Sequence, residues 1–170
     1  METINEYNNL INSFRLPRIN EIPDLELYMD QVIIYVKKYF SIFPYETETN
    51  FITSSMINNY VKNGLMPPPI GKKYTKRHIA YIFTIFFLKQ VFSLEEVKAF
   101  IRLQIKNSNE KNAYEQFCDV LEEELQICSS QNNINPTKET NIWDSTIRHA
   151  TISIANKLYS QFLIKNQIKK

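Results

Sequence analysis

Short polar side chains and clustered cations fall within one stretch of the sequence, residues 53–77. Asparagine can pair with an adenine edge through two hydrogen bonds, and serine can bond a base or a phosphate. Lysine and arginine neutralise phosphates and give salt-dependent affinity without sequence information. The two tyrosines can either pack through their rings or also donate their hydroxyls to phosphate. The candidate DNA-binding residues are Thr53, Ser54, Ser55, Asn58, Asn59, Tyr60, Lys62, Lys72, Lys73, Tyr74, Lys76 and Arg77.

The charge of the chain is concentrated in its middle third, although the net charge is only +2. Residues 51–106 carry nine basic and two acidic side chains, whereas residues 1–50 have a net charge of −4 and residues 107–170 of −1. No acidic residue occurs from Phe51 to Phe92. A segment that carries only positive charge favours a polyanionic partner. The alternative is that these basic side chains simply form a solvated surface.

Two sharp turns must position these side chains, because both glycines of the chain lie here. A helix over about 54–63 begins at a hydroxyl cap and ends at Gly64, where a left-handed residue is favoured. Three prolines then impose an extended run. Gly71-Lys72 predicts a type II′ turn, which would join short strands at 69–70 and 73–74.

The rest of the sequence has mainly helical periodicity. Helices are expected over about 24–40, 76–91, 93–106, 109–128 and 139–165, and residues 1–20 form a short arm or helix. The helix at 76–91 begins at a Thr75 cap and is apolar nearly all round, which is typical of a buried central helix.

The last two predicted helices differ in the surface that each presents. Four acidic residues of the helix at 109–128 are predicted to face solvent: Glu115, Asp119, Glu122 and Glu123. The helix at 139–165 has an apolar stripe that is wide enough to pack on the helix at 109–128 or on a second copy of the chain.

The order of these elements predicts a mainly α fold. Residues 1–20 form an N-terminal arm, residues 21–106 a winged helix-turn-helix with a short β-hairpin wing, and residues 107–170 a C-terminal helical region for dimerisation or an effector. His78 follows the basic cluster and can either reach a phosphate or pack inside the protein.

The segment "ITSSMINNYVKNGLMPPPIGKKYTKRHIAYI" resembles a winged helix of the mercury-resistance-regulator (MerR) type. The places that fit are Thr53, Tyr60, Gly64-Leu65, Pro67, Tyr74-Thr75 and the capping box at Ser93–Val97. Two features differ, because the family's Arg-Tyr pair is Asn58-Asn59 here and the wing is shorter. The resemblance implies a recognition helix and a DNA-contacting wing.

The strings "LELYMDQV" and "MINNYVKNGL" carry a second resemblance, which covers roughly residues 15–130. They are similar to a bacterial family catalogued as domain of unknown function 1836. That name states no activity, so this resemblance supports the fold and its boundaries more than a function.

The sequence therefore predicts a regulator that binds double-stranded DNA as a homodimer, since such regulators pair two half-sites. The alternative is a winged-helix interaction module for an acidic protein. An enzyme, a metal and a cofactor are not expected, because His78 and His149 lie far apart, no spacing suits zinc and two glycines leave no phosphate loop. An effector is left unspecified. The longest apolar run, Ile79–Leu88, is too short for a membrane span, and we expect a cytoplasmic location.

Overall fold

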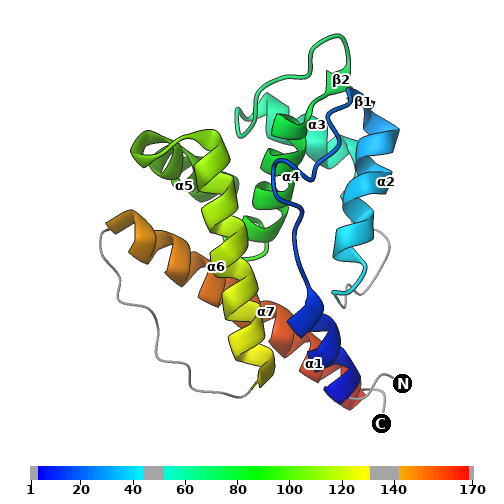
Figure 1. Cartoon of the computed structure of the whole chain (residues 1–170), viewed down its shortest axis with the longest axis vertical. Helices are drawn as coiled ribbons and strands as arrows, with labels where there is room; N and C mark the ends of the chain where they lie inside the picture. The colour runs from blue at the N-terminus through cyan, green and yellow to red at the C-terminus, as the bar shows by residue number, and fades with distance from the viewer. Residues whose placement is uncertain (1–3, 44–51, 131–141, 169–170) are drawn as a thin grey trace.

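The computed structural model describes residues 4–43, 52–130 and 142–168. These residues form seven helices and one two-stranded sheet, which confirms the mainly α class (Figure 1). In chain order the elements are α1 (Ile4–Ser13), β1 (Leu27–Tyr28), α2 (Met29–Phe40), α3 (Ser54–Lys62), β2 (Lys73–Tyr74), α4 (Lys76–Leu88), α5 (Leu94–Asn107), α6 (Glu110–Ser130) and α7 (Ile142–Ile168).

The small sheet joins two segments that are far apart in the sequence. β1 pairs antiparallel with β2, so that Leu27 lies opposite Tyr74 and Tyr28 opposite Lys73. The expected hairpin is only a single bridge between Ile70 and Lys73, and the main partner of β2 precedes α2. α2 consequently begins at Met29 rather than near residue 24, because the residues before it pair as a strand.

The turn between Ile70 and Lys73 differs in type from the one predicted. Gly71 has a φ of 56° and Lys72 a φ of 65°. Positive φ at both central residues is the mark of a type I′ turn, so the predicted type II′ turn is wrong. Type I′ turns suit short hairpins because their twist matches that of the flanking strands.

The end of α3 follows the sequence prediction at Gly64. This glycine has a φ of 67°, and its N–H donates to the Val61 carbonyl at 3.0 Å. The Leu65 N–H donates to the Tyr60 carbonyl at 3.0 Å, and the Leu65 side chain is buried. These two bonds are those of a Schellman motif, which turns the chain away from the helix.

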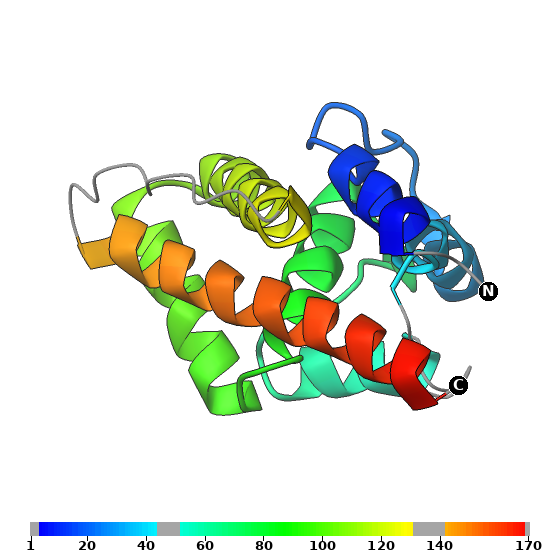
Figure 2. The same cartoon turned by 90° about the horizontal axis from the view of Figure 1, so that it is seen from below.

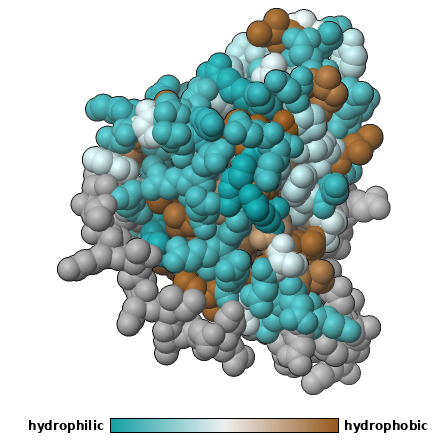
Figure 3. Space-filling view, in the orientation of Figure 1, coloured by the Kyte–Doolittle hydropathy of each residue, from teal (hydrophilic) through white to brown (hydrophobic). Residues whose placement is uncertain are grey.

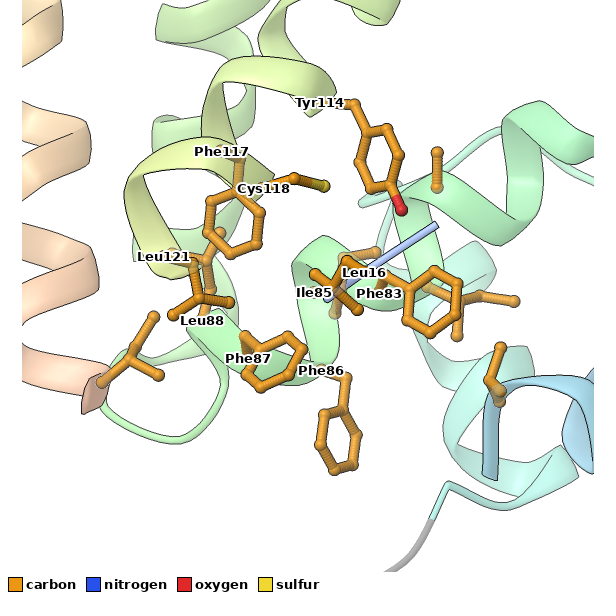
Figure 4. Close-up of a cluster of buried hydrophobic side chains, with 14 of the residues drawn as sticks. Leu16, Phe83, Ile85, Phe86, Phe87, Leu88, Tyr114, Phe117, Cys118 and Leu121 are labelled. Atoms are coloured by element: carbon orange, nitrogen blue, oxygen red, sulfur yellow. The ribbon is translucent and has the colours of Figure 1, made fainter. Parts of the chain in front are cut away.

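α4 is the buried central helix that its composition predicts. Phe83, Phe86 and Phe87 are all buried, and the Phe86 ring stacks on Phe40 of α2 with centroids 3.7 Å apart. Figure 4 shows these rings of α4 beside side chains of α6 and Leu16 of the N-terminal segment. The core therefore joins parts of the chain on both sides of the basic segment.

α7 packs on α6 within the same chain, and Figure 2 shows the two helices side by side. The described part of its apolar stripe also meets α4 and α5, and its packing on α6 confirms the first of the two predicted arrangements. Among the α7 side chains that the structure describes, the buried ones are Ile147, Arg148, Ala150, Thr151, Ile154, Ala155 and Leu158.

The N-terminal segment, residues 16–19, crosses α6 and is fixed by acidic side chains. Both guanidinium NH groups of Arg18 meet Glu122, at 2.7 and 2.8 Å, and one also meets Asp119 at 2.6 Å. Glu122 accepts from the Leu16 N–H at 2.8 Å, and Glu115 accepts from the Ile19 N–H at 3.2 Å. The prediction of a solvent-facing side chain is therefore wrong for Glu122, which is 12% exposed, and Glu115 is half-buried. Asp119 faces solvent as predicted, with 67% of its side chain exposed, and also holds this segment.

The three predicted parts of the chain share one hydrophobic cluster. Leu16, Phe83 and Phe117 all belong to it, and each comes from a different part. The division at residues 20 and 106 stays a prediction about function.

Candidate nucleic-acid interface

α3 separates its side chains into an exposed polar side and a buried apolar side. Thr53 caps the helix, as predicted, because its Oγ1 accepts from the Met56 N–H at 3.2 Å. Ile57 and Tyr60 are buried on the inner side. The outward residues are those that the sequence singled out: Ser54, Ser55, Asn58, Asn59 and Lys62.

The two neighbouring asparagines of α3 are in different states. Asn63 donates from Nδ2 to both the side-chain and main-chain oxygens of Asn59, at 2.8 Å each. The Asn59 amide therefore already uses an acceptor lone pair. The Asn58 side chain forms no hydrogen bond to any residue that the structure describes, so both its donor and acceptor remain available for an adenine edge.

Tyr60 and Tyr74 lie inside the protein rather than at the surface. Tyr60 is 2% exposed, and its buried hydroxyl has no partner among the described residues. Burial raises the pKa of Tyr60 to about 12. Tyr74 is 3% exposed and meets the His78 ring edge to face, with centroids 5.6 Å apart. Both rings therefore pack inside the protein, as the packing alternative predicts, and the Tyr60 hydroxyl is enclosed with its ring.

His78 is also a packing residue, and it ties the proline run to the start of α4. Its Nδ1 accepts from the Thr75 N–H at 3.1 Å. The proton therefore lies on Nε2, which donates to the Pro68 carbonyl at 3.2 Å. This arrangement fixes the extended run against the helix that follows it.

Three of the predicted cations already have acidic partners. Lys73 contacts Glu26 at 3.1 Å, and Lys76 contacts Asp24 at 3.1 Å. Arg77 pairs with Glu110 of α6. Burial alone would raise the pKa of Glu110, but hydrogen bonds from Arg77 and Tyr81 outweigh burial and lower it.

The acidic partners come from outside the acid-free stretch. β1–β2 pairing brings Asp24 and Glu26 to the turn, and α6 brings Glu110. Within the described residues Lys62 and Lys72 form no ion pair, so they are the cations of this set with unshared charge. Exposed pairs such as Lys73–Glu26 are weak, and a phosphate can replace the carboxylate.

Lys98 belongs to this region, although sequence reasoning did not select it. Its Nζ donates to the Asn63 carbonyl at 2.8 Å, at the C-terminal end of α3. The C-terminal end of a helix carries a partial negative charge, so a cation placed there is stabilising. Only the tertiary structure reveals this role, because Lys98 lies on α5 and is distant in sequence.

The structure offers no metal centre in the part of the chain that it describes, since no three His, Cys, Asp or Glu side chains gather as ligands there. Across the same described ranges, each helix is too short or too polar to cross a bilayer.

Comparison with known proteins gives one family. The family model described as "Domain of unknown function (DUF1836)" matches residues 17–120. No curated protein and no solved structure matches the chain. The matched range begins in the N-terminal segment, next to Arg18, and ends within α6, which is the helix that holds this segment. The chain belongs to the family of the domain of unknown function DUF1836.

Proposed function

We propose that the chain is a cytoplasmic, DNA-binding transcription regulator with a MerR-like winged helix-turn-helix. α3 is the recognition helix and the Ile70–Lys73 turn is the tip of the wing. The observation that carries the proposal is the exposed polar side of α3, which is free of acidic residues. An exposed α-helix of this kind fits the width of the major groove.

Base contacts come from the outward side chains of α3. Ser54 and Ser55 lie in its first turn, where recognition helices meet base edges. Asn58 follows one turn later and has an amide that is free among the described residues. Asn58 is therefore the side chain that reads adenine, while Asn59 is restricted by its bond to Asn63.

Phosphate contacts come from the cations around the turn. Lys72 stands at the exposed tip with unshared charge, and Lys62 lies at the end of α3. Lys73 and Lys76 contribute by exchanging their carboxylate partners for phosphate. Each exchange leaves an acidic side chain near the DNA, so these two cations add less affinity than Lys72.

The expected homodimer is part of the proposal, and we place its interface outside the apolar stripe of α7 that the structure describes. The described apolar stripe of α7 is covered by α4, α5 and α6. Two half-sites are the reason to expect a pair of subunits. The solution mass, measured with and without duplex DNA, tests this point.

The experiment is fluorescence anisotropy with duplexes selected from a random library, repeated over a range of salt concentrations. Binding should weaken steeply with salt, and Lys72→Ala should reduce the slope by about one counterion. Asn58→Ala should relax the preference for adenine by roughly 1–3 kcal/mol. Lys38→Ala is the control, because this exposed lysine lies at the end of α2 far from β1. Absence of duplex binding near 50 mM salt contradicts the proposal.

Substitution of the acidic partners in two ion pairs provides a more specific test of where DNA binds. Glu26→Gln and Asp24→Asn remove negative charge beside the proposed phosphate track while they preserve side-chain shape. Both should increase DNA affinity at low salt, and the gain should disappear at high salt. Unchanged affinity in both variants would place the DNA away from the β1–β2 sheet.

A second function is favoured by exposed apolar side chains over β1, α2 and the turn. Leu25, Tyr28, Ile34 and Ile70 are between 56% and 75% exposed. Figure 3 shows apolar atoms along this edge of a mainly hydrophilic face. These side chains would suit a protein-interaction module that binds an acidic partner. In that case one protein partner would remain bound after nuclease treatment, and Ile70→Ser would release it.

A further inference from the structure

A cavity of about 220 Å³ lies between α4, α5 and α6, on the side of the molecule that the N-terminal segment crosses. Its wall is largely apolar. Several of the wall side chains also belong to the hydrophobic core, which holds them in place. The main wall residues are Ala80, Phe100, Ile101, Ile105, Ala113 and Phe117. An apolar cavity of roughly 150 Å³ is enough to hold benzene, so this one has room for two fused rings.

Two of the polar groups that line the cavity are already bonded to the protein. Gln104 is 4% exposed, and its Nε2 donates to the Trp143 carbonyl at 3.2 Å. The Tyr81 hydroxyl donates to Glu110 at 2.8 Å. A polar molecule would replace few of its bonds to water here, whereas an apolar ring system would lose none.

Cations dominate the rim of the cavity. Lys76, Arg77 and Lys111 line it together with a single carboxylate, that of Glu110. Arg77 is committed to Glu110, and Lys76 is shared with Asp24. Lys111 is exposed and forms no ion pair to any described residue. The rim therefore has an excess of positive charge, with one ammonium group available to a ligand.

We infer that this cavity binds a small molecule with a planar apolar body, the size of two fused rings, and one anionic group. The body lies against Phe100, Ile101 and Phe117, and the anionic group meets Lys111 at the rim. Shape and charge select this class together, since the wall favours an apolar body and the rim favours an anion. The site does not depend on the proposed DNA-binding function.

The test is calorimetric titration of the whole chain with 2-naphthoate, in the absence of DNA. 2-Naphthamide, which has the same shape without the charge, is the matched probe. We expect saturable binding of one equivalent of naphthoate and roughly threefold to tenfold weaker binding of the amide, because the charge pair is partly exposed. No saturable heat with millimolar naphthoate would overturn the inference.

Two pairs of variants locate the site. Ala113→Leu fills the cavity and should weaken naphthoate at least tenfold, while Ala99→Leu makes the same change on an exposed part of α5. Lys111→Met should weaken naphthoate severalfold but not the amide, and Lys106→Met should affect neither. Binding that survives Ala113→Leu in a folded protein would place the ligand elsewhere and contradict the inference.

Protein–ligand NMR guards against a variant that fails to fold. Naphthoate protons should show nuclear Overhauser contacts to the methyl groups of Ile101 and Ile105 in the unaltered chain. Contacts confined to other methyl groups would overturn the assignment. Because no DNA is present, failure of this site would leave the proposed function untouched, and loss of DNA binding would leave the site untouched.

Discussion

The Nζ atom of Lys98 lies 2.8 Å from the main-chain oxygen of Asn63, so α5 supplies a cation to the end of α3. We predict that Lys98→Met, which keeps most of the aliphatic stem, lowers the free energy of unfolding by about 1 kcal/mol. Urea denaturation measures the change. Lys106→Met, on an exposed part of the same helix, should have little effect. Equal effects of the two substitutions would show that the bond to Asn63 contributes nothing specific.

Arg18 should matter far more to stability than its neighbour Arg15. The Arg18 and Glu122 side chains are 16% and 12% exposed, whereas the Arg15 pair with Glu21 is mostly in water. Arg18→Met leaves carboxylates of α6 without their partner, so we expect a loss of about 2–4 kcal/mol. Arg15→Met should cost less than about 1 kcal/mol. Chemical denaturation of both variants makes the comparison, and equal losses would contradict this role of the N-terminal segment.

Tyr60→Phe separates packing from DNA contact. The Tyr60 hydroxyl is buried without a partner among the described residues, so its removal should leave stability unchanged or raise it by about 0.5–1 kcal/mol. DNA affinity should not change, because this hydroxyl cannot reach a phosphate from inside the protein. Thermal melting and anisotropy measure the two effects. A clear loss of DNA affinity in a folded variant would show that the ring leaves its site on binding.

Glu110 should give the protein an acid-sensitive contribution to stability. Burial alone would raise its pKa, but hydrogen bonds from Arg77 and Tyr81 outweigh burial and lower it. The folded state therefore favours the carboxylate, and the stabilisation is complete above the unfolded pKa of about 4.5. It is lost as the pH falls through the lower pKa of the folded state.

Glu110→Gln removes this contribution. The variant should be less stable near neutral pH by about 0.5 kcal/mol, because the pair is partly exposed, and the difference should vanish at acid pH. Melting temperatures between pH 3 and pH 7 follow the change, with Glu95→Gln at the exposed start of α5 as the control. A difference that persists at acid pH would point to lost packing rather than lost charge.

The helices could be predicted from the sequence because each has local signals. The capping box at Ser93 is an example, since Ser93 donates its N–H to Glu96 at 2.8 Å and accepts from the Glu96 N–H at 3.3 Å. Gly64 is another, because a left-handed residue at a helix end strongly favours glycine. Such signals depend on residues within one or two turns, which a single sequence displays directly.

The strand β1 and the ion pairs could not be predicted in the same way. A two-residue strand has too few positions to show an alternating pattern, so the sequence predicts Leu27–Tyr28 as part of the helix over 24–40. The pairing of Lys73 with Glu26 depends on that strand. The acid-free run in the sequence was real, but the fold returns acidic side chains to it from two distant segments.

The attachment of the N-terminal segment to α6 also imposes an order on synthesis. Arg18 leaves the ribosome long before its partner Glu122, which is 104 residues later in the chain. Until α6 is made, the Leu16 N–H and the Arg18 guanidinium both lack the Glu122 carboxylate that accepts from them. Fixing of this segment must therefore wait for contacts of very long range, which form only after most of the domain has been synthesised.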